Sequence, residues 1–312
     1  MINIDDIKQA QNRIEGFIYK TPLIKLPLEE EVFAKAENMQ KTNSFKIRGA
    51  FNFLASLSAD ERAKGVTAPS SGNHAQALAC AANYFGVAAA IAIPHNAPPI
   101  KVEATKAWGA EVKRCGGSTL ERRAAAQYFV DTRGYHYVPP FDHELTIAGQ
   151  ATIGLEILED MPDVKNILVP TGGGGLLAGI ALAVKSLNKD IKVYGVEPEL
   201  AADVTESYQK GRRILWPAEK TTSTIADGVR TQQVGELNFE IIKKHVDGFF
   251  TASEDEIVEA ARFYLHKAKI MLEPTGALTL AAYLANKSQI KAKTVLLVSG
   301  GNFSPEFLKQ LI

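Results

Sequence analysis

The chain has 312 residues, more than a single hydrophobic core usually serves, so we expect two lobes. Hydrophobic residues make up 46% of it, and 35 basic residues balance 35 acidic ones without a long basic run, so we expect neither a nucleic-acid nor a membrane partner. The two cysteines, Cys80 and Cys115, exclude a disulfide framework or a cysteine-rich zinc site and favour a reducing, cytoplasmic location.

The first predicted element is a helix. Isoleucines recur at helical spacing from Ile4 to Ile18, Asn3 is a candidate N-cap, and Thr21-Pro22 ends the helix. The opening residues are acidic rather than basic and then apolar, so we expect no signal peptide. A second helix is predicted after Lys46.

Strands and helices then alternate in two series. The first is predicted as strand Val66–Pro69, helix Asn73–Phe85, strand Val87–Pro94, helix Pro99–Trp108, strand Ala110–Arg114, helix Ser118–Arg133 and strand Tyr135–Val138. The second is predicted as strand Asn166–Val169, helix Gly175–Leu187, strands Lys192–Val196 and Gly248–Thr251, helices Glu254–Met271 and Gly276–Ala285, and strand Thr294–Val298.

This alternation predicts an α/β fold of two lobes, with largely parallel sheets covered by helices. A break near Pro139-Pro140-Phe141 indicates a crossing between the lobes. We therefore predict a large domain of residues 1–63 and 142–312, with a small domain of residues 64–141 inserted into it. In such folds, ligands bind at the carboxyl ends of strands, beside helix N-termini.

Lys46 is the strongest catalytic candidate. It stands among apolar and small residues in Asn43-Ser44-Phe45-Lys46-Ile47-Arg48-Gly49-Ala50, just before a helical pattern. Burial lowers the pKa of an amine, and a neutral amine can form a Schiff base with a carbonyl. A lysine that snorkels at a helix start is the alternative.

A glycine run, Gly172-Gly173-Gly174-Gly175, follows a strand and opens a helix. Its backbone N–H groups and the helix N-terminus can hold a phosphate. A flexible turn is one alternative. Another is a dinucleotide site, because Gly173-x-Gly175-x-x-Ala178 is followed by Glu197 after the next strand. That hypothesis leaves Lys46 unexplained.

Three further segments carry polar side chains at strand ends. Hydroxyl, amide and N–H groups in Ser70-Ser71-Gly72-Asn73-His74 suit a substrate carboxylate, or else ordinary N-capping. In Ser299-Gly300-Gly301-Asn302, the serine could meet a ring nitrogen, or the segment could be a simple turn. Carboxylates in the segment from Glu197 to Asp203 suit a hard cation or a solvated loop equally well.

Together these segments resemble the fold-type-II pyridoxal-phosphate (PLP) enzymes, which are tryptophan synthase beta-like in fold. Within them the chain is similar to the serine/threonine dehydratase and serine racemase family. The resemblance covers nearly the whole chain. It rests on the ordered set Ser44-Phe45-Lys46-Ile47-Arg48-Gly49, Ser71-Gly72-Asn73-His74, the four glycines and Ser299-Gly300-Gly301-Asn302.

The resemblance implies a role for each motif. Lys46 would bind the aldehyde of PLP as an imine and then act as the base for the α-proton. Phe45 would pack on the ring, Asn73 would bind the 3′-hydroxyl and Ser299 would face the ring nitrogen. The phosphate would lie on the backbone of Gly172, Gly173, Gly174, Gly175 and Leu176, and the substrate would be bound by Ser70, Ser71, Gly72, Asn73 and His74.

The implied activity is an ammonia-lyase reaction in which L-threonine or L-serine yields a 2-oxo acid and ammonia by α,β-elimination. Ser71, where short degradative threonine dehydratases often carry alanine, makes serine racemase or hydroxyaspartate dehydratase the alternative, with Ser71 acting on the face opposite Lys46. Glu197, the Ala201 carbonyl and Asp203 match the divalent-metal site of the racemase branch, which implies Mg²⁺ or Ca²⁺. Glu273 also matches that branch.

The chain departs from the family pattern at Asn43 and Ala151, where glycine is usual. It stops soon after Ser299, so we expect no C-terminal regulatory domain. A homodimer is expected from the resemblance. Two functions of other classes stay open: a nicotinamide-dependent oxidoreductase that uses the glycine loop, and a non-catalytic amino-acid sensor on the same fold.

Overall fold

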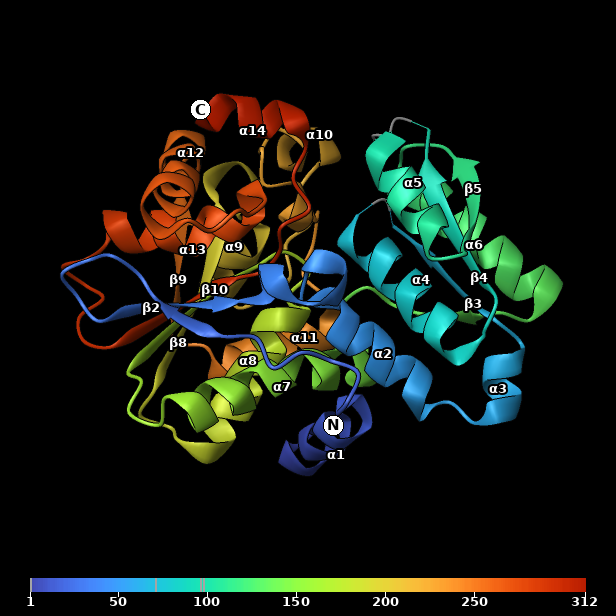
Figure 1. The fold of residues 1–312 in the computed structure, drawn as a ribbon, viewed down its shortest axis with the longest axis horizontal. Coiled ribbons are helices and arrows are strands. Elements are labelled where there is room, and N and C mark those ends of the chain that lie inside the picture. The colour runs from blue at the N-terminus through green and yellow to red at the C-terminus, as the bar shows by residue number, and fades with distance from the viewer. Residues whose placement is uncertain (1, 71, 96, 98) are drawn as a thin grey trace.

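The computed structural model describes residues 2–70, 72–95, 97 and 99–312, whose strands form two separate sheets (Figure 1). One sheet has six strands in the order β1-β2-β10-β7-β8-β9, and the other has four in the order β5-β4-β3-β6. Neighbouring strands are parallel except for the pair β1 and β2. The predicted α/β class with largely parallel sheets is therefore confirmed.

The strands are short, and those from β3 onward lie at or close to the positions that the sequence predicts. Those of the six-stranded sheet are β1 (Leu23–Lys25), β2 (Val32–Ala36), β7 (Asn166–Pro170), β8 (Lys192–Pro198), β9 (Gly248–Ala252) and β10 (Thr294–Val298). Those of the four-stranded sheet are β3 (Val66–Pro69), β4 (Ala89–Pro94), β5 (Glu111–Cys115) and β6 (His136–Tyr137). Only β1 and β2 were not predicted, because neither gives a long apolar run.

Helices surround both sheets. Up to residue 160 they are α1 (Ile4–Ile14), α2 (Lys46–Ser56), α3 (Ala59–Ala63), α4 (Asn73–Phe85), α5 (Pro99–Ala107), α6 (Thr119–Arg133) and α7 (Glu144–Asp160). After it they are α8 (Gly175–Leu187), α9 (Asp203–Lys210), α10 (Ala218–Thr221), α11 (Glu236–His245), α12 (Glu254–Phe263), α13 (Pro274–Ala285) and α14 (Pro305–Leu311). Short 3₁₀ turns are η1 (Glu37–Met39), η2 (Lys41–Asn43), η3 (Glu199–Ala201) and η4 (Asp227–Val229), and η5 (Tyr264–Ala268) is a π-helical turn. Of the helices described, none combines the length and the apolar character needed to cross a bilayer.

Local chemistry explains where some helices begin and end. The side chain of Asn3 accepts hydrogen bonds from two backbone N–H groups of α1, as its predicted role as N-cap requires. The predicted single helix Glu254–Met271 is wrong in its second half, because α12 gives way to η5 and the chain leaves it at Lys269 with a left-handed φ of 60°.

Helices cover the six-stranded sheet on both faces. Along β10, Val295 and Leu297 belong to one apolar core, and Leu296 and Val298 belong to another, as the alternation of side chains in a strand requires. The first core is shared with α7 and α8, and the second with α12 and α13. A third core lies between the four-stranded sheet and the helices α2 and α4.

The helix α2 joins the two sheets, because it packs against both α4 and α7. Its crossing with α7 is very close: a Cβ added to Gly49 would lie 2.4 Å from Gln150 Nε2, and one added to Gly149 would lie 2.6 Å from the Arg48 carbonyl oxygen. The core of the four-stranded sheet thus includes residues before position 64. The domain boundaries at residues 63/64 and 141/142 stay a prediction.

A buried ion network anchors α2 next to this crossing. Arg48 is fully buried and donates to both carboxylate oxygens of Glu37, at 2.8 Å each, and to Glu156 at 2.9 Å. Lys35, also fully buried, donates to Glu156 at 2.6 Å. Two cations therefore balance two carboxylates, which is the condition under which buried charges are tolerated.

We expect Glu37→Gln to lower the free energy of unfolding by about 3–5 kcal/mol, because it leaves the buried guanidinium of Arg48 with one carboxylate in place of two. Urea denaturation followed by circular dichroism measures the loss. The matched control is Glu30→Gln, which removes one partner of the exposed Lys287–Glu30 pair and should change stability little. Equal effects of the two variants would contradict the anchoring role.

Candidate active site

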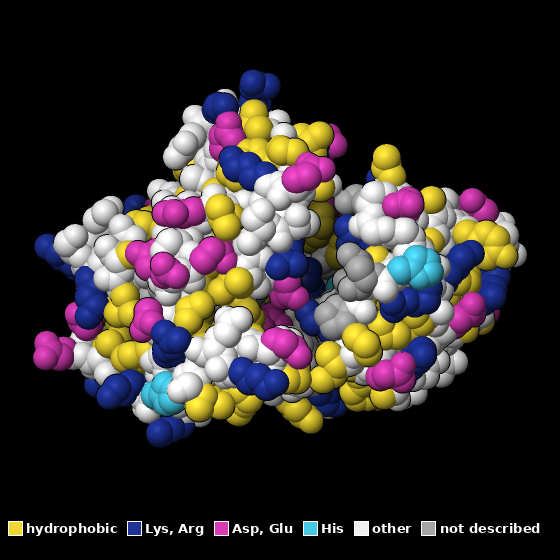
Figure 2. Space-filling view, turned by 90° about the horizontal axis from the view of Figure 1, so that it is seen from above, with side chains coloured by type: hydrophobic (Ala, Val, Ile, Leu, Met, Phe, Trp, Pro, Cys, Tyr) yellow, Lys and Arg dark blue, Asp and Glu magenta, His cyan; other side chains and the backbone are white. Residues whose placement is uncertain are grey.

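A cavity of about 520 Å³ lies where the carboxyl ends of the two sheets meet. Its lining includes the last residues of β3, β4 and β7, which are Pro69, Pro94 and Pro170, and Ser299, which follows β10. Figure 2 shows a hollow between the two parts of the molecule, with charged side chains visible inside it. The cavity therefore occupies the position in which parallel α/β folds bind ligands.

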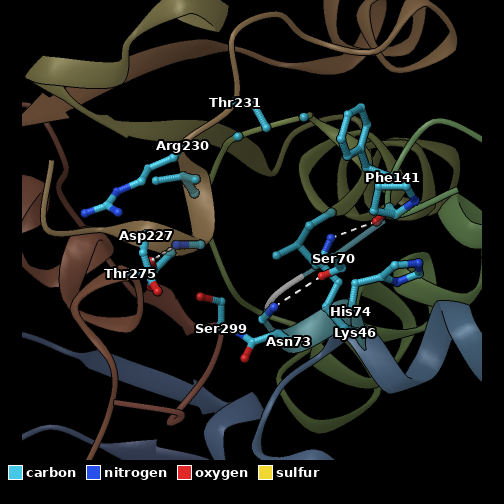
Figure 3. A pocket seen from close by; sticks show the side chains of 18 of the residues that line it. Lys46, Ser70, Asn73, His74, Phe141, Asp227, Arg230, Thr231, Thr275 and Ser299 are labelled. Atoms are coloured by element: carbon cyan, nitrogen blue, oxygen red, sulfur yellow. Dashed lines mark hydrogen bonds between the residues drawn. The ribbon is translucent and has the colours of Figure 1, made fainter. Parts of the chain in front are cut away.

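Lys46 is the first residue of α2 and lines this cavity. Its amine donates to the Pro140 carbonyl oxygen at 2.7 Å and lies 5.1 Å from the centre of the Phe45 ring (Figure 3). Although part of the side chain faces the cavity, the amine is deep in the protein, and burial lowers the pKa of Lys46 to about 8. The amine can thus lose its proton near neutral pH, as a nucleophile or a base must.

Main-chain contacts hold Lys46 beside the end of β10. Ser44 forms an isolated antiparallel bridge with Gly300, and the Phe45 N–H donates to the Ser299 carbonyl oxygen at 3.1 Å. Two motifs more than 250 positions apart in the sequence are thereby brought to the same wall of the cavity. Ser299 is 2% exposed, and its hydroxyl has no hydrogen-bond partner among the residues that the structure describes.

The glycine run forms another wall, between β7 and α8. A Cβ at Gly173 would lie 2.4 Å from the Phe141 ring, one at Gly175 would lie 2.6 Å from the Phe141 carbonyl oxygen, and Gly174 has a φ of +91°. Larger residues are therefore excluded, and the backbone itself faces the cavity. At the start of α8 the N–H groups lack intrahelical acceptors, so the loop can bind an anion.

The segment between β3 and α4 also reaches the cavity. The Ser70 hydroxyl accepts from the Gly72 N–H at 3.3 Å, and the Asn73 amide donates to Glu273 at 2.8 Å. His74 Nε2 lies 3.0 Å from the Val138 carbonyl oxygen, and burial, with the charge of Lys46, lowers the pKa of His74 to about 3. His74 is thus a neutral, hydrogen-bonded histidine. Ser71, a predicted catalytic residue, lies outside the described residues.

The predicted metal ligands lie elsewhere, since the lining of the cavity includes none of Glu197, Ala201 and Asp203. The Glu197 carboxylate accepts from the backbone N–H groups of Val204 and Thr205, at 3.1 and 2.6 Å. Burial and the charge of Asp203 raise the pKa of Glu197, and burial raises the pKa of Asp203 to about 7.

Within the described part of the chain, neither carboxylate oxygen of Asp203 has a hydrogen-bond partner. The described residues contain no group of three or more His, Cys, Asp or Glu side chains placed to hold a metal, whereas the predicted set has two carboxylates and one carbonyl. Two buried carboxylates without a cation are electrostatically incomplete, which is compatible with a hard cation between them.

Sequence reasoning missed several residues that line the cavity. Phe141 was noted only as part of a break, and Lys101 and Asp227 were not noted at all, although they form an ion pair between α5 and η4. Asn302, whose motif carries no assigned role for it, is not in the lining but hydrogen-bonds to Asn73, which is. No local pattern marks these residues, because their partners lie far away in the sequence.

Comparison with known proteins agrees with the geometry. The family model described as "Pyridoxal-phosphate dependent enzyme" matches residues 14–301. The chain therefore belongs to the family of pyridoxal-phosphate-dependent enzymes, and the predicted PLP cofactor and type-II fold follow from this membership.

Relatives within the family carry several activities. The chain is 42% identical to the L-threonine ammonia-lyase of Thermotoga maritima, over 100% of this chain and 78% of that protein. It is 40% identical to the L-threo-3-hydroxyaspartate ammonia-lyase of Saccharomyces cerevisiae, over 95% and 92%. Among solved structures, maize serine racemase has a TM-score of 0.95 and 36% identity, over 99% and 96%.

The dinucleotide hypothesis has no geometric support. Its acidic residue, Glu197, would have to reach a ribose, but both carboxylate oxygens accept hydrogen bonds from the start of α9. The carboxylate is also absent from the lining of the cavity that the glycine run borders.

In the cofactor-free protein, we expect Lys46→Met to raise the free energy of unfolding at pH 7 by roughly 2–3 kcal/mol. Below pH 8 the folded protein must hold a buried ammonium, which opposes folding. Between pH 8 and 10.5 the folded lysine is neutral and the unfolded one is still protonated, so unfolding takes up a proton. Raising the pH makes this uptake less favourable, and the penalty on folding therefore falls until it disappears near pH 10.5. The gain from Lys46→Met should therefore be absent at pH 10.5.

Urea denaturation of both proteins at pH 7, 9 and 10.5 measures this difference. The control is Lys189→Met, at an exposed lysine, which should give no pH-dependent difference. A Lys46→Met effect that is the same at all three pH values would show that the amine is not desolvated.

Proposed function

We propose that this protein is a PLP-dependent ammonia-lyase that converts L-threonine or L-serine to a 2-oxo acid and ammonia. The observation that carries the proposal is the buried amine of Lys46, with a pKa of about 8, in a cavity bordered by the glycine run. Relatives named as threonine and hydroxyaspartate ammonia-lyases support the reaction class.

The residues present fit the cofactor. Lys46 would hold its aldehyde, and the backbone of Gly172–Gly175 with the Leu176 N–H would hold its phosphate. The hydroxyl of Ser299, buried without a partner in the described structure, would meet the ring nitrogen. Phe45 would pack on the ring, and Asn73 would bind the ring oxygen.

The protein's own residues then have separate roles in the reaction. PLP supplies an electron sink for the charge that develops at the substrate's α-carbon. Lys46 takes the α-proton, for which a pKa near the working pH is suited. Ser299 is uncharged and cannot keep a proton on the ring nitrogen as a carboxylate would, so it favours prompt loss of the β-hydroxyl. The substrate carboxylate binds at the N-terminus of α4, to the residues from Ser70 to His74.

A racemase activity on the same residues is the second candidate. The solved structure of a serine racemase matches this chain closely, and the hydroxyl of Ser71 would return a proton to the face opposite Lys46. Hydroxyaspartate is the second candidate substrate, because Arg122 lines the cavity and could receive an additional carboxylate, while Arg123 is exposed.

Three further predictions stay part of the proposal. Glu197, the Ala201 carbonyl and Asp203 would bind Mg²⁺ or Ca²⁺, which would supply the cation that the two buried carboxylates lack. The protein would act as a homodimer. It would work in the cytoplasm on a small amino-acid substrate.

We expect Lys46→Ala to abolish ammonia release from L-threonine, L-serine and L-threo-3-hydroxyaspartate. Borohydride treatment of the wild type should leave a pyridoxyl group on the peptide that contains Lys46, as detected by mass spectrometry. The matched control, Lys25→Ala, alters an exposed lysine and should keep both ammonia release and the pyridoxyl adduct. A chelator added to the same assays of ammonia release tests the proposed metal site separately. Release of ammonia by Lys46→Ala at the wild-type rate would overturn the proposal.

We expect Ser71→Ala to lower racemisation of L-serine by a factor of 100 or more, on the order of what one positioned acid–base group contributes, and to spare elimination. The D-enantiomer is measured by chiral chromatography and the 2-oxo acid by a coupled assay. Equal loss of both activities would count against a role for Ser71 in proton return.

A further inference from the structure

Asn302 connects three segments next to the cavity, through its side chain and its backbone N–H, and two of its partners, Asn73 and Glu273, line the cavity. Its Nδ2 donates to the Thr42 carbonyl oxygen at 2.9 Å and to Asn73 Oδ1 at 2.8 Å, and its Oδ1 lies 3.4 Å from Asn43 Nδ2. Its backbone N–H donates to Glu273 at 3.2 Å. The side-chain amide therefore links η2, which precedes Lys46, to the N-terminus of α4, and the backbone N–H of the same residue links both to the N-cap of α13.

The direction of these hydrogen bonds is fixed by a backbone group. The carbonyl of Thr42 can only accept, so the NH₂ end of Asn302 must face it, and this end also faces Asn73. Asn73 must then present its oxygen to Asn302 and its NH₂ end to Glu273, where the donor–acceptor distance is 2.8 Å. Both amide hydrogens of Asn302 are used, whereas the second hydrogen of Asn73 has no acceptor among the described residues.

Asn302 also holds a strained turn. Thr42 and Asn43 have φ values of 61° and 54°, a left-handed conformation that a β-branched residue adopts only where its surroundings enforce it. The Gly301 N–H donates to the Asn43 carbonyl oxygen at 2.8 Å, which adds to the side-chain contacts. The turn leads directly into Lys46, and Figure 3 shows Lys46, Asn73 and Ser299 around the same cavity.

We propose that Asn302 is a positioning residue for Asn73. It fixes the Asn73 amide so that Nδ2, after donating to Glu273, keeps one hydrogen directed to the ring oxygen of PLP. The inference rests on the proposed role of Asn73 in binding that oxygen. It assigns the direction of the Asn73 amide to a residue outside the lining of the cavity.

Replacing the side-chain nitrogen of Asn302 with oxygen should change the direction of the Asn73 amide. Asn302→Asp keeps the shape of the side chain but replaces the NH₂ donor with a carboxylate oxygen. Asn73 would then lie between two carboxylates, those of residues 302 and 273, and both of its amide hydrogens would turn to them. None would remain for the ring oxygen. Because a hydrogen bond to a charged oxygen is among the stronger ones, the loss should be measurable in the cofactor itself.

The test uses the purified enzyme with and without PLP. Titration of the cofactor-free protein should show that Asn302→Asp weakens PLP binding roughly tenfold. The visible absorption spectrum of bound PLP should change in the same way as in Asn73→Ala. Since Asn302 acts through Asn73, the double variant should be no worse than Asn73→Ala alone.

Two further variants keep the test decisive. Asn188→Asp introduces the same charge at an exposed asparagine and should leave binding and spectrum unchanged. Asn302→Ala removes the donor without adding a charge, and should give the same spectral change even if Asn302→Asp folds poorly, which thermal denaturation would report.

The outcomes separate the inference from the function on which it rests. If Asn73→Ala alters the spectrum but neither Asn302 variant does, or if the effects add in the double variant, the positioning role is overturned. If Asn73→Ala is silent, the assignment of Asn73 is wrong, and the role of Asn302 is overturned with it. The borohydride adduct at Lys46 would still decide the proposed chemistry independently.

Discussion

α2 begins at Lys46, and two residues later Arg48 enters a network of buried charges that sets where the helix lies. The guanidinium contacts Glu37 and Glu156, while the glycines at positions 49 and 149 let the helices α2 and α7 approach to backbone contact. Buried ion pairs add little net stability compared with apolar packing, but they accept only one geometry. The network therefore determines position more than stability, and the position it determines is that of the amine.

The amine is useful because its charge is not neutralised nearby. Among the described residues its hydrogen-bond acceptor is a neutral carbonyl, that of Pro140, and burial alone accounts for the lowered pKa of Lys46. The adjacent His74 stays neutral as well, with a pKa of about 3. A carboxylate placed beside Lys46 would stabilise the ammonium and remove both nucleophile and base. Within the described part of the chain, the site therefore combines paired charges at Arg48 with an amine at Lys46 that has no carboxylate partner.

Alternation of strands and helices was enough to predict the α/β class and the bounds of β3 and α4. α7 was missed because it is buried on all sides, so its sequence lacks the apolar stripe that marks a surface helix. The glycine run and Ser299 each follow a strand and could be predicted to meet, since strand ends lie at one edge of a sheet, whereas only the family resemblance joined Lys46 to them. The contacts of Asn302 could not, because they join positions more than 200 residues apart and depend on atomic distances.

The cavity is also where the two sheets are coupled by polar contacts. Asn73, at the start of α4, hydrogen-bonds to Glu273 and Asn302 on the side of the six-stranded sheet, and Lys101 of α5 pairs with Asp227. Burial and the charge of Asp227 raise the pKa of Glu273 to about 7, so this carboxyl sits in an environment that disfavours its charge. A donor at Asn73 offsets that penalty, and the same amide is the group proposed to bind the ring oxygen. Asn73, which would hold the cofactor, thus also takes part in the contacts that join the two sheets. A change in the position of one sheet relative to the other would therefore alter the cofactor contacts directly.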